Sequence, residues 1–314
     1  RTLIMISLTV LSITGIAVMM IHAKQWTNPA RWIAIIGAFL ALVSIRFDHL
    51  AILPTIQVST IGNLWAALII GLLLLILLLV PNRNVIHTVR NDHIALLIFS
   101  TIGAVLLTRF DHAITLLLGL EIMSIPLYVL AAQTHSKRSH EASLKYFTLG
   151  AFSSAVLTFG IALLYRSSGI LEIPGMLAGD FIGQIGTVLV IAALCFKVGL
   201  VPFHYWVPDV YEGAPTSFTA FMSSVAKVAA VAALFKVTAV IPATQWTDFA
   251  VWIGSASILV GSFAALKQSS VKRMLAYSSI AQAGFWLLFI KWKPVFNLFW
   301  LCLRDCIYSF VLDL

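Results

Sequence analysis

The chain has 314 residues, of which 61% are hydrophobic and 10% are charged, and its mean hydropathy is +1.00. Soluble domains carry about 25% charged residues, so this composition excludes an ordinary soluble domain and indicates a polytopic membrane protein whose helices form one bundle. The formal net charge of +8 predicts no nucleic-acid partner, because Lys and Arg gather between the apolar segments, as the positive-inside rule expects.

The apolar segments predict an all-α bundle of transmembrane helices. In chain order the expected spans are residues 3–22, 31–47, 62–80, 93–108, 112–131, 144–166, 183–207, 217–241, 247–267, 272–290 and, more weakly, 295–312. The first segment is counted as a span because it is too long for the apolar core of a signal peptide and lacks a small-residue cleavage site. The span at 183–207 is expected to be broken, since Gly199 and Pro202 interrupt it.

The distribution of Lys and Arg between the spans predicts the orientation. With the N-terminus outside, ten of these residues fall in cytoplasmic loops and five, among them Arg109, fall in outer loops. This bias favours an outside N-terminus. The loop that carries Asp209 and Glu212 is the exception, because it is expected to be cytoplasmic and contains neither Lys nor Arg.

The broken span carries the first candidate site residue, Lys197. Proline removes a backbone donor and clashes with the preceding turn, so Pro202 ends or kinks the helix. Such a break at membrane depth is tolerated only inside protein or beside a wet cavity, and an intramembrane lysine marks an ion pathway by default. Lys227 lies about ten residues into the next span, roughly 15 Å or half the hydrocarbon core. The two lysines predict a protein that moves charge.

A carboxylate, Glu121, lies about nine residues into the fifth span, or roughly 14 Å. It is expensive there unless it is protonated or paired. Lys197 and Lys227 are the cations at similar depth in the neighbouring spans. Two interpretations remain open: a structural ion pair that holds the bundle together, or a proton pathway, which the general rule for intramembrane charges favours.

The remaining titratable residues give weaker signals. His204, just after the break, is either a satisfied interfacial histidine or a proton relay, because imidazole titrates near neutral pH. Lys145 follows Glu141 by four residues, which predicts a surface ion pair in preference to a pathway role. Lys236, Lys272 and Arg273 are expected to be end residues that reach the membrane surface.

Several familiar chemical motifs are absent from the sequence. It contains no GxxxxGK[ST] phosphate loop and no HExxH motif. Its three cysteines, Cys195, Cys302 and Cys306, match no metal spacing and are interpreted as small apolar residues. We therefore expect no metal and no cofactor in this chain, so any redox or nucleotide chemistry must belong to partners.

Four stretches together resemble a known family. They read GLEIMSIPLYVL around Glu121, EASLKYFTLGAFSSAVLTFGIALLY, FKVGLVPFHYWVPDVYEGAPTSFTAFMSSVAKVAA around both lysines, and KQSSVKRMLAYSSIAQAGF. They resemble subunit N of bacterial NADH:quinone oxidoreductase, the equivalent of mitochondrial subunit 2 of respiratory complex I. The resemblance covers about residues 93 to 290, and the VPDVYEGAP form favours subunit N over related antiporter-like subunits.

The resemblance implies two inverted five-helix repeats, each with one broken helix, and a proton route along the membrane midplane. It assigns the family's relay residues to Glu121, Lys197 and Lys227. The implied domains are N-terminal helices at 1–92, a first repeat at 93–241 and an incomplete second repeat at 242–314. After Ile290 the sequence departs from the family, so a truncated, frameshifted or degenerate chain is expected, unable to complete a proton path alone.

The function implied by the resemblance is that of a proton-translocating membrane-arm subunit. The complex would use NADH, FMN, iron–sulfur clusters and quinone in other subunits, and its membrane-arm subunits and the bilayer would be the partners. The bacterial inner membrane is the expected location, with the mitochondrial inner membrane as the alternative. Two other classes remain open: a stand-alone cation/proton antiporter, and a structural remnant without transport.

Overall fold

The computed structural model describes residues 5–22, 27–50, 55–56, 58–79, 91–133, 136–176, 180–241 and 243–291. Within these residues the regular elements are helices, and the only β pairing consists of two isolated bridges. Their bounds are α1 Ile6–His22, α2 Thr27–Ser44, η1 Ile45–Leu50, α3 Thr60–Leu79, α4 Asn91–Arg109, α5 Ala113–Ala131, α6 Lys137–Ser168, α7 Ile173–Met176, α8 Phe181–Val198, α9 Trp206–Gly213, α10 Thr216–Phe221, η2 Met222–Ala226, α11 Lys227–Thr238, α12 Ala243–Leu266 and α13 Val271–Lys291.

The helices confirm the all-α membrane fold. Over the described residues, eight helical segments are long and apolar enough to cross a membrane, and α1 is a shorter apolar helix. Each span expected between residues 3 and 290 coincides with one helix or with consecutive helices: α8 and the start of α9 at 183–207, and α10, η2 and α11 at 217–241. The weak candidate at 295–312 lies outside the described residues. The short helix α7 was not expected from the sequence.

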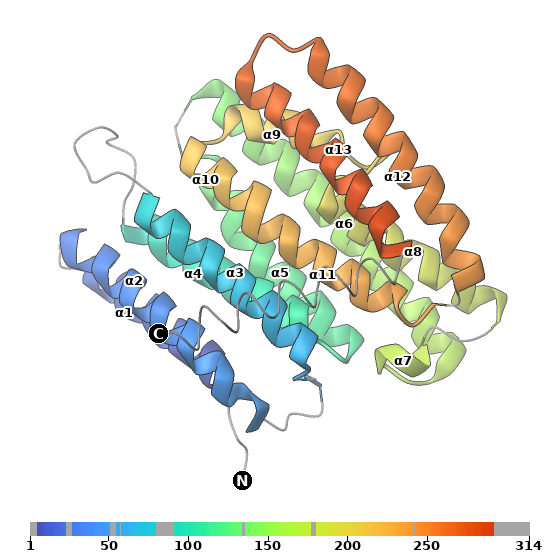
Figure 1. Cartoon of the computed structure of the whole chain (residues 1–314), viewed down its shortest axis with the longest axis horizontal. Helices are drawn as coiled ribbons and strands as arrows, with labels where there is room; N and C mark the ends of the chain where they lie inside the picture. The colour runs from blue at the N-terminus through green and yellow to red at the C-terminus, as the bar shows by residue number, and fades with distance from the viewer. Residues whose placement is uncertain are drawn as a thin grey trace.

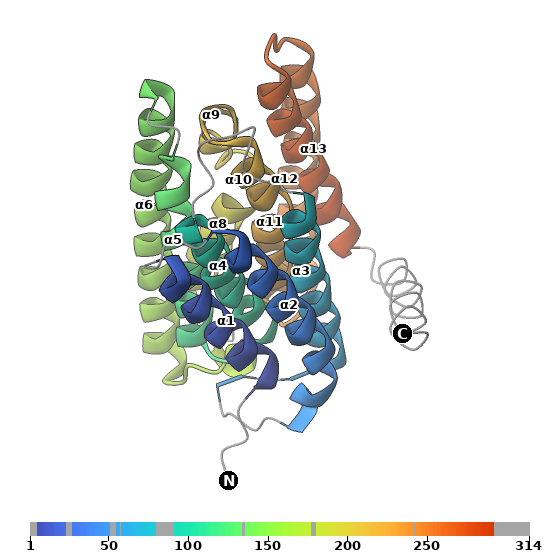
Figure 2. The same ribbon diagram turned by 90° about the vertical axis from the view of Figure 1, so that its left-hand side faces the viewer.

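The helices form one elongated bundle (Figures 1 and 2). At one end α1 packs against α2 and α4, and α3 packs against α4. The middle is built from α4, α5, α6, α8 and α11, with α8 contacting both α6 and α11. At the other end α12 and α13 form a tightly packed pair, and α13 contacts α9. The short helix α9 therefore bridges the central helices and this terminal pair.

The predicted break follows Lys197 in the structure. Helix α8 ends at Val198, and Gly199 has a φ of +82°, a conformation that side-chain-bearing residues rarely adopt. The chain then turns through residues 200–205 before α9 begins. Polar groups freed by the break find new partners: the Trp206 Nε1 donates to the Phe196 carbonyl at 2.9 Å, and the Val201 amide donates to the Ser257 hydroxyl at 3.0 Å. This satisfies the requirement that membrane-buried backbone groups be hydrogen-bonded.

Helices α4 and α5 approach each other at Gly103. A Cβ atom at this position would lie 2.7 Å from the Gly119 carbonyl oxygen and would also overlap the backbone of Met123. Real Cβ atoms do not approach backbone this closely, so glycine is required for the present contact. Gly71 on α3 is the contrasting case, because a Cβ there would meet no atom within 4 Å.

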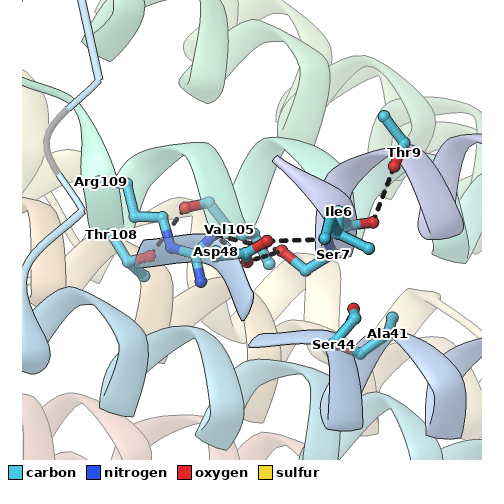
Figure 3. Close-up of polar contacts among 9 residues, drawn as sticks. All are labelled: Ile6, Ser7, Thr9, Ala41, Ser44, Asp48, Val105, Thr108 and Arg109. Atoms are coloured by element: carbon cyan, nitrogen blue, oxygen red, sulfur yellow. Dashed lines mark hydrogen bonds and ion pairs between the residues drawn. The ribbon is translucent and has the colours of Figure 1, made fainter. Parts of the chain in front are cut away.

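A buried ion pair holds the N-terminal helices to α4 (Figure 3). The Arg109 guanidinium and the Asp48 carboxylate lie 2.7 Å apart, and both side chains are completely buried. The Ser7 amide donates to Asp48 at 3.0 Å, and its hydroxyl donates to the same carboxylate. Arg109 is therefore not the loop cation that the orientation analysis assumed. Instead it joins η1 and the beginning of α1 to the end of α4.

Candidate functional site

Lys197 lies in the last turn of α8, just before the break, and its side chain is buried. Its Nζ donates to the Ser124 hydroxyl at 2.8 Å and to the Tyr128 hydroxyl at 3.2 Å. The same Nζ lies 5.6 Å from the centroid of the Tyr128 ring. The carbonyl end of a helix favours a positive charge. The local structure therefore suits a charged lysine held by the neutral oxygen atoms of Ser124 and Tyr128.

Glu121 lies on the same face of α5 as those two partners. Ser124 and Tyr128 follow it by three and seven residues, a spacing that repeats along one helix face. The carboxylate is close enough to Lys197 for an electrostatic interaction, but among the described residues no ion pair joins the two. One Glu121 oxygen, Oε1, is buried without a hydrogen-bond partner. Ser124 and Tyr128 thus occupy the direct contacts of Lys197.

Lys227 begins α11, directly after the wide π-helical turn η2. Its side chain is buried, and its Nζ donates to the Ser279 carbonyl at 3.0 Å and to the Ser279 hydroxyl at 2.7 Å. The Nζ also lies 5.8 Å from the centroid of the Tyr211 ring. Wide turns of this kind occur often at functional sites. Lys227 therefore links α11 to α13 and α9.

A cavity of about 580 Å³ opens beside Lys227. Its walls come from α3, α9, α10, η2, α11 and α13, together with Val198, the neighbour of Lys197. Hydroxyl and amide side chains from Thr216, Thr219, Ser223, Ser278, Ser279 and Gln282 line it, and Lys272 contributes a second ammonium group. No carboxylate is among the described lining residues. A cavity of this size with these polar partners has room for several water molecules.

His204 lies in the turn between α8 and α9, and its side chain is buried. Its ring stacks on the Tyr205 ring with centroids 4.5 Å apart, and its Nδ1 has no hydrogen-bond partner. Over the described residues, no hydrogen bond connects His204 to Lys197 or Lys227. The relay function expected for His204 therefore stays a prediction.

Lys145 lies on α6 and confirms the predicted surface pair, with its Nζ 2.7 Å from the Glu141 carboxylate. It also forms a second ion pair, at 2.8 Å, with Asp209 on α9. Arg273 on α13 contacts Asp209 at 2.8 Å and Glu212 at 3.0 Å. We call these five residues the α9 clamp. Asp209 and Glu212 therefore lie on the helix α9 and not in the loop expected from the sequence, and Lys145 and Arg273 supply the positive charges that this segment lacks.

The sequence interpretation of three terminal cations was incomplete. Arg273 belongs to the α9 clamp, and the Lys272 Nζ donates to the Ala214 carbonyl at the end of α9 at 2.9 Å. Lys236 lies 3.7 Å from the Asp111 carboxylate and 5.0 Å from the Phe110 ring centroid. Each of these three cations therefore contacts other protein groups and not the membrane surface, because neighbouring helices place acceptors within its reach.

The α9 clamp also determines the ionisation of Asp209. Burial acts to raise the pKa of its carboxyl group, but the hydrogen bonds and charges of Lys145 and Arg273 outweigh this effect. The pKa of Asp209 consequently lies below its ordinary value. Asp209 is therefore charged at neutral pH and holds α9 between α6 and α13.

Sequence reasoning found the charged residues and missed their neutral partners. The missed partners are Ser124 and Tyr128 at Lys197, and Ser279 and Tyr211 at Lys227. The spacing of Ser124 and Tyr128 from Glu121 was a usable signal, since all three share a helix face. Ser279 lies 52 residues from Lys227, so no local pattern could reveal that contact. Over the part of the chain described here, no group of three or more His, Cys, Asp or Glu side chains is arranged to hold a metal ion.

Comparison with known proteins gives a consistent result. The family model described as "NADH:quinone oxidoreductase/Mrp antiporter, TM" matches residues 111–299. The NADH-quinone oxidoreductase subunit N of Cytophaga hutchinsonii is 43% identical over 207 residues, covering 63% of this chain and 45% of the relative. The subunit N of Flavobacterium johnsoniae is 35% identical over 305 residues, covering 89% of this chain and 66% of the relative. The chain thus spans about half to two thirds of the length of these relatives.

Solved structures share the same fold. A chain of respiratory complex I from Thermus thermophilus with bound aureothin has a TM-score of 0.81 and 32% identity, covering 91% of this chain and 64% of that one. A chain of the Mrp complex from Dietzia has a TM-score of 0.78 at 20% identity, covering 90% of this chain and 57% of that one, which is a likeness of fold. The family model covers more than half of the sequence, including Glu121, both buried lysines and the break between them. The chain therefore belongs to the NADH:quinone oxidoreductase/Mrp antiporter transmembrane family.

Proposed function

We propose that this chain is a proton-translocating membrane-arm subunit of an NADH:quinone oxidoreductase. The observation that carries the proposal is the pair of buried lysines: Lys197 beside a broken helix, and Lys227 beside a cavity of about 580 Å³ whose mainly apolar walls carry several hydroxyl groups. Buried intramembrane lysines are costly, and they mark ion pathways more often than passive structure. The subunit N relatives and their membrane-embedded fold support the assignment.

In the proposed mechanism, protons pass along a relay of Glu121, Lys197 and Lys227. The Glu121 carboxylate stabilises the charged form of Lys197 across the face of α5. When Glu121 is neutralised or moves away, the proton on Lys197 loses this support and is passed toward Lys227 and the waters of the cavity. The turn around Gly199 and Pro202 hydrates or dries the route between them. His204 is a candidate extra relay on this route, and Lys145 acts mainly through the α9 clamp.

The redox chemistry is assigned to other subunits. Electrons pass from NADH through flavin and iron–sulfur centres to quinone in the partner subunits, and this chain responds by moving protons. Its partners are other membrane-arm subunits and the bilayer. Its proposed location is the bacterial inner membrane, because the curated relatives come from bacteria. A stand-alone cation/proton antiporter is the second candidate, which the similarity of fold to the Mrp complex favours.

The test uses the assembled complex in inverted membrane vesicles. NADH-driven acidification is measured together with NADH oxidation and with the amount of complex, for Lys227→Ala and for Lys236→Ala. Lys236 is the matched control, because it lies on the same helix and pairs with Asp111 away from the cavity. The expected result is that Lys227→Ala loses most of the acidification at normal assembly, while Lys236→Ala retains it.

Normal acidification in assembled Lys227→Ala vesicles would refute the relay. Affinity purification separates the two candidate functions. Co-purification with flavin and iron–sulfur subunits supports the proposed subunit, whereas recovery of a free protein that exchanges protons for cations would support the antiporter.

A further inference from the structure

A continuous row of aromatic rings connects the two lysines. Lys197 bonds the hydroxyl of Tyr128, whose ring meets Tyr146 edge to face at a centroid distance of 4.8 Å. Tyr146 stacks on Trp206 at 4.9 Å, and Trp206 meets Tyr211 at 6.4 Å. Lys227 then lies over Tyr211. All four rings are buried. We call Tyr128, Tyr146, Trp206 and Tyr211 the aromatic row.

The row crosses three helices and depends on the short helix α9. Tyr128 belongs to α5 and Tyr146 to α6, while Trp206 and Tyr211 both belong to α9. Trp206 also bonds the carbonyl of Phe196, the residue just before Lys197. Tyr211 forms part of the cavity wall beside Lys227. The short helix α9 therefore contacts the surroundings of both lysines.

Neither lysine has a counter-ion in direct contact, although Glu121 acts on Lys197 from a distance, and Tyr211 is the aromatic face that Lys227 meets. Within the described residues, no carboxylate lies within ion-pair distance of Lys197 or Lys227, and the other contacts of both ammonium groups are neutral oxygens. An ammonium group over an aromatic face is attracted by the negative charge of that face, most strongly where water is excluded. Aromatic side chains also have few rotatable bonds, so they fix the position of a cation more firmly than a long carboxylate does.

We propose that the aromatic row is a positioning element of the relay. Tyr211 holds the Lys227 ammonium at the cavity wall, Tyr128 holds the Lys197 ammonium, and the Tyr146–Trp206 stack fixes the two positions relative to each other. The α9 clamp sets the position of the row from outside. This inference rests on the proposed relay function and adds neutral aromatic residues to its charged members.

Helix α11 carries one other charged residue, Lys236, which pairs with Asp111. On α13, Lys272 lines the cavity and bonds the Ala214 carbonyl, Arg273 pairs with Asp209 and Glu212, and Tyr277 interacts with Arg273. On α9 the carboxylates Asp209 and Glu212 are ion-paired in the clamp. On α4, Arg109 is paired with Asp48. Asp92 and His93 lie at the other end of α4 from Arg109, and α8 contributes Lys197. Helix α3 has no charged residue. Besides Ser279, which bonds the ammonium directly, Tyr211 is the group through which α9 acts on the Lys227 charge.

The test is the pH profile of proton flux in vesicles that contain the assembled complex. Tyr211→Phe keeps the ring and should keep the wild-type midpoint. Tyr211→Leu removes the ring, and its midpoint should fall by about one pH unit, because the ammonium form loses its aromatic support. Tyr165→Leu is the matched control, since Tyr165 is half-exposed on α6 and lies outside the row.

A shape-preserving series guards against misfolding of the Leu variant. Phenylalanine with increasing numbers of ring fluorines at position 211 keeps the size of the ring and progressively weakens the charge on its face. A midpoint that moves stepwise with fluorine number supports the positioning function. A flat series, or a Phe variant that shifts as far as the Leu variant, overturns it. If Lys227→Ala itself leaves flux unchanged, the relay has failed; if it abolishes flux while the ring variants behave as wild type, only this inference has failed.

Discussion

Replacing Asp48 with Asn should lower the free energy of unfolding by about 3–5 kcal/mol, because it leaves the Arg109 charge buried without its partner. Both side chains are completely buried, and Arg109 has two further nitrogen atoms, Nε and Nη2, without hydrogen-bond partners. Asn keeps the size of Asp, removes the charge and turns one of the two acceptor oxygens into an NH2 donor. The loss should therefore reflect the ion pair and the charge-assisted bonds from Ser7.

The assay is chemical unfolding in detergent micelles, followed by helical circular dichroism. Glu141→Ala is the control, because Glu141 forms an ion pair on the exposed surface and its removal should cost less than about 1 kcal/mol. The double variant Asp48→Leu with Arg109→Met tests the cause. Removing both charges together should recover most of the stability lost by the single variant, since a well-packed apolar pair avoids the cost of burying ions.

The reasoning is refuted if Asp48→Asn costs no more than Glu141→Ala. It is also refuted if the double variant is as unstable as the single one, because the loss would then come from packing and not from an unpaired charge.

Two further predictions concern packing and pH. Gly103→Ala should lower the free energy of unfolding by about 1–3 kcal/mol, because its Cβ would overlap the α5 backbone. Gly71→Ala should raise the free energy of unfolding by about 0.5–1 kcal/mol through helix propensity alone. Both are measured with the same unfolding assay, and equal effects at the two sites would contradict the close helix contact. The contribution of Asp209 to stability should be fully present above its ordinary pKa of 3.8 and should be lost as the pH falls through the lower pKa of the folded state. Unfolding measured between about pH 5 and pH 2 should show this loss in the wild type, and Asp209→Asn should remove that part of the pH dependence.

The sequence predicted the elements whose cause is local. Apolar runs of about 20 residues identify spans, and Gly199 with Pro202 identifies the break, because each depends on neighbouring residues only. The pair of Lys145 with Glu141 also follows from a local spacing. The buried charges of Lys197 and Lys227 stand out for the same reason, since a lysine inside an apolar run is visible without any tertiary information.

Contacts between distant segments could not be predicted in this way. Arg109 and Asp48 are 61 residues apart, and each follows an apolar run where a surface loop is the ordinary expectation. The direct partners of Lys197 are hydroxyl groups, although charge alone favoured Glu121 as its nearest neighbour. Lys197 contacts the hydroxyl groups for a geometric reason: its ammonium lies one to two helical turns along α5 from Glu121, beside Ser124 and Tyr128.

The wide turn at Met222–Ala226 changes how this region should be aligned between related sequences. The π turn closes its hydrogen bonds between residues i and i+5, so it takes up one more residue than an α-helical turn and keeps the faces of the flanking helices in register. If the same residues were wound as a regular α-helix, Lys227 would rotate by about 100° relative to α10 and would no longer face Ser279. A one-residue gap at this turn is therefore the change that keeps the same face of α11 toward the cavity, whereas a regular helix without the gap turns a different face toward it.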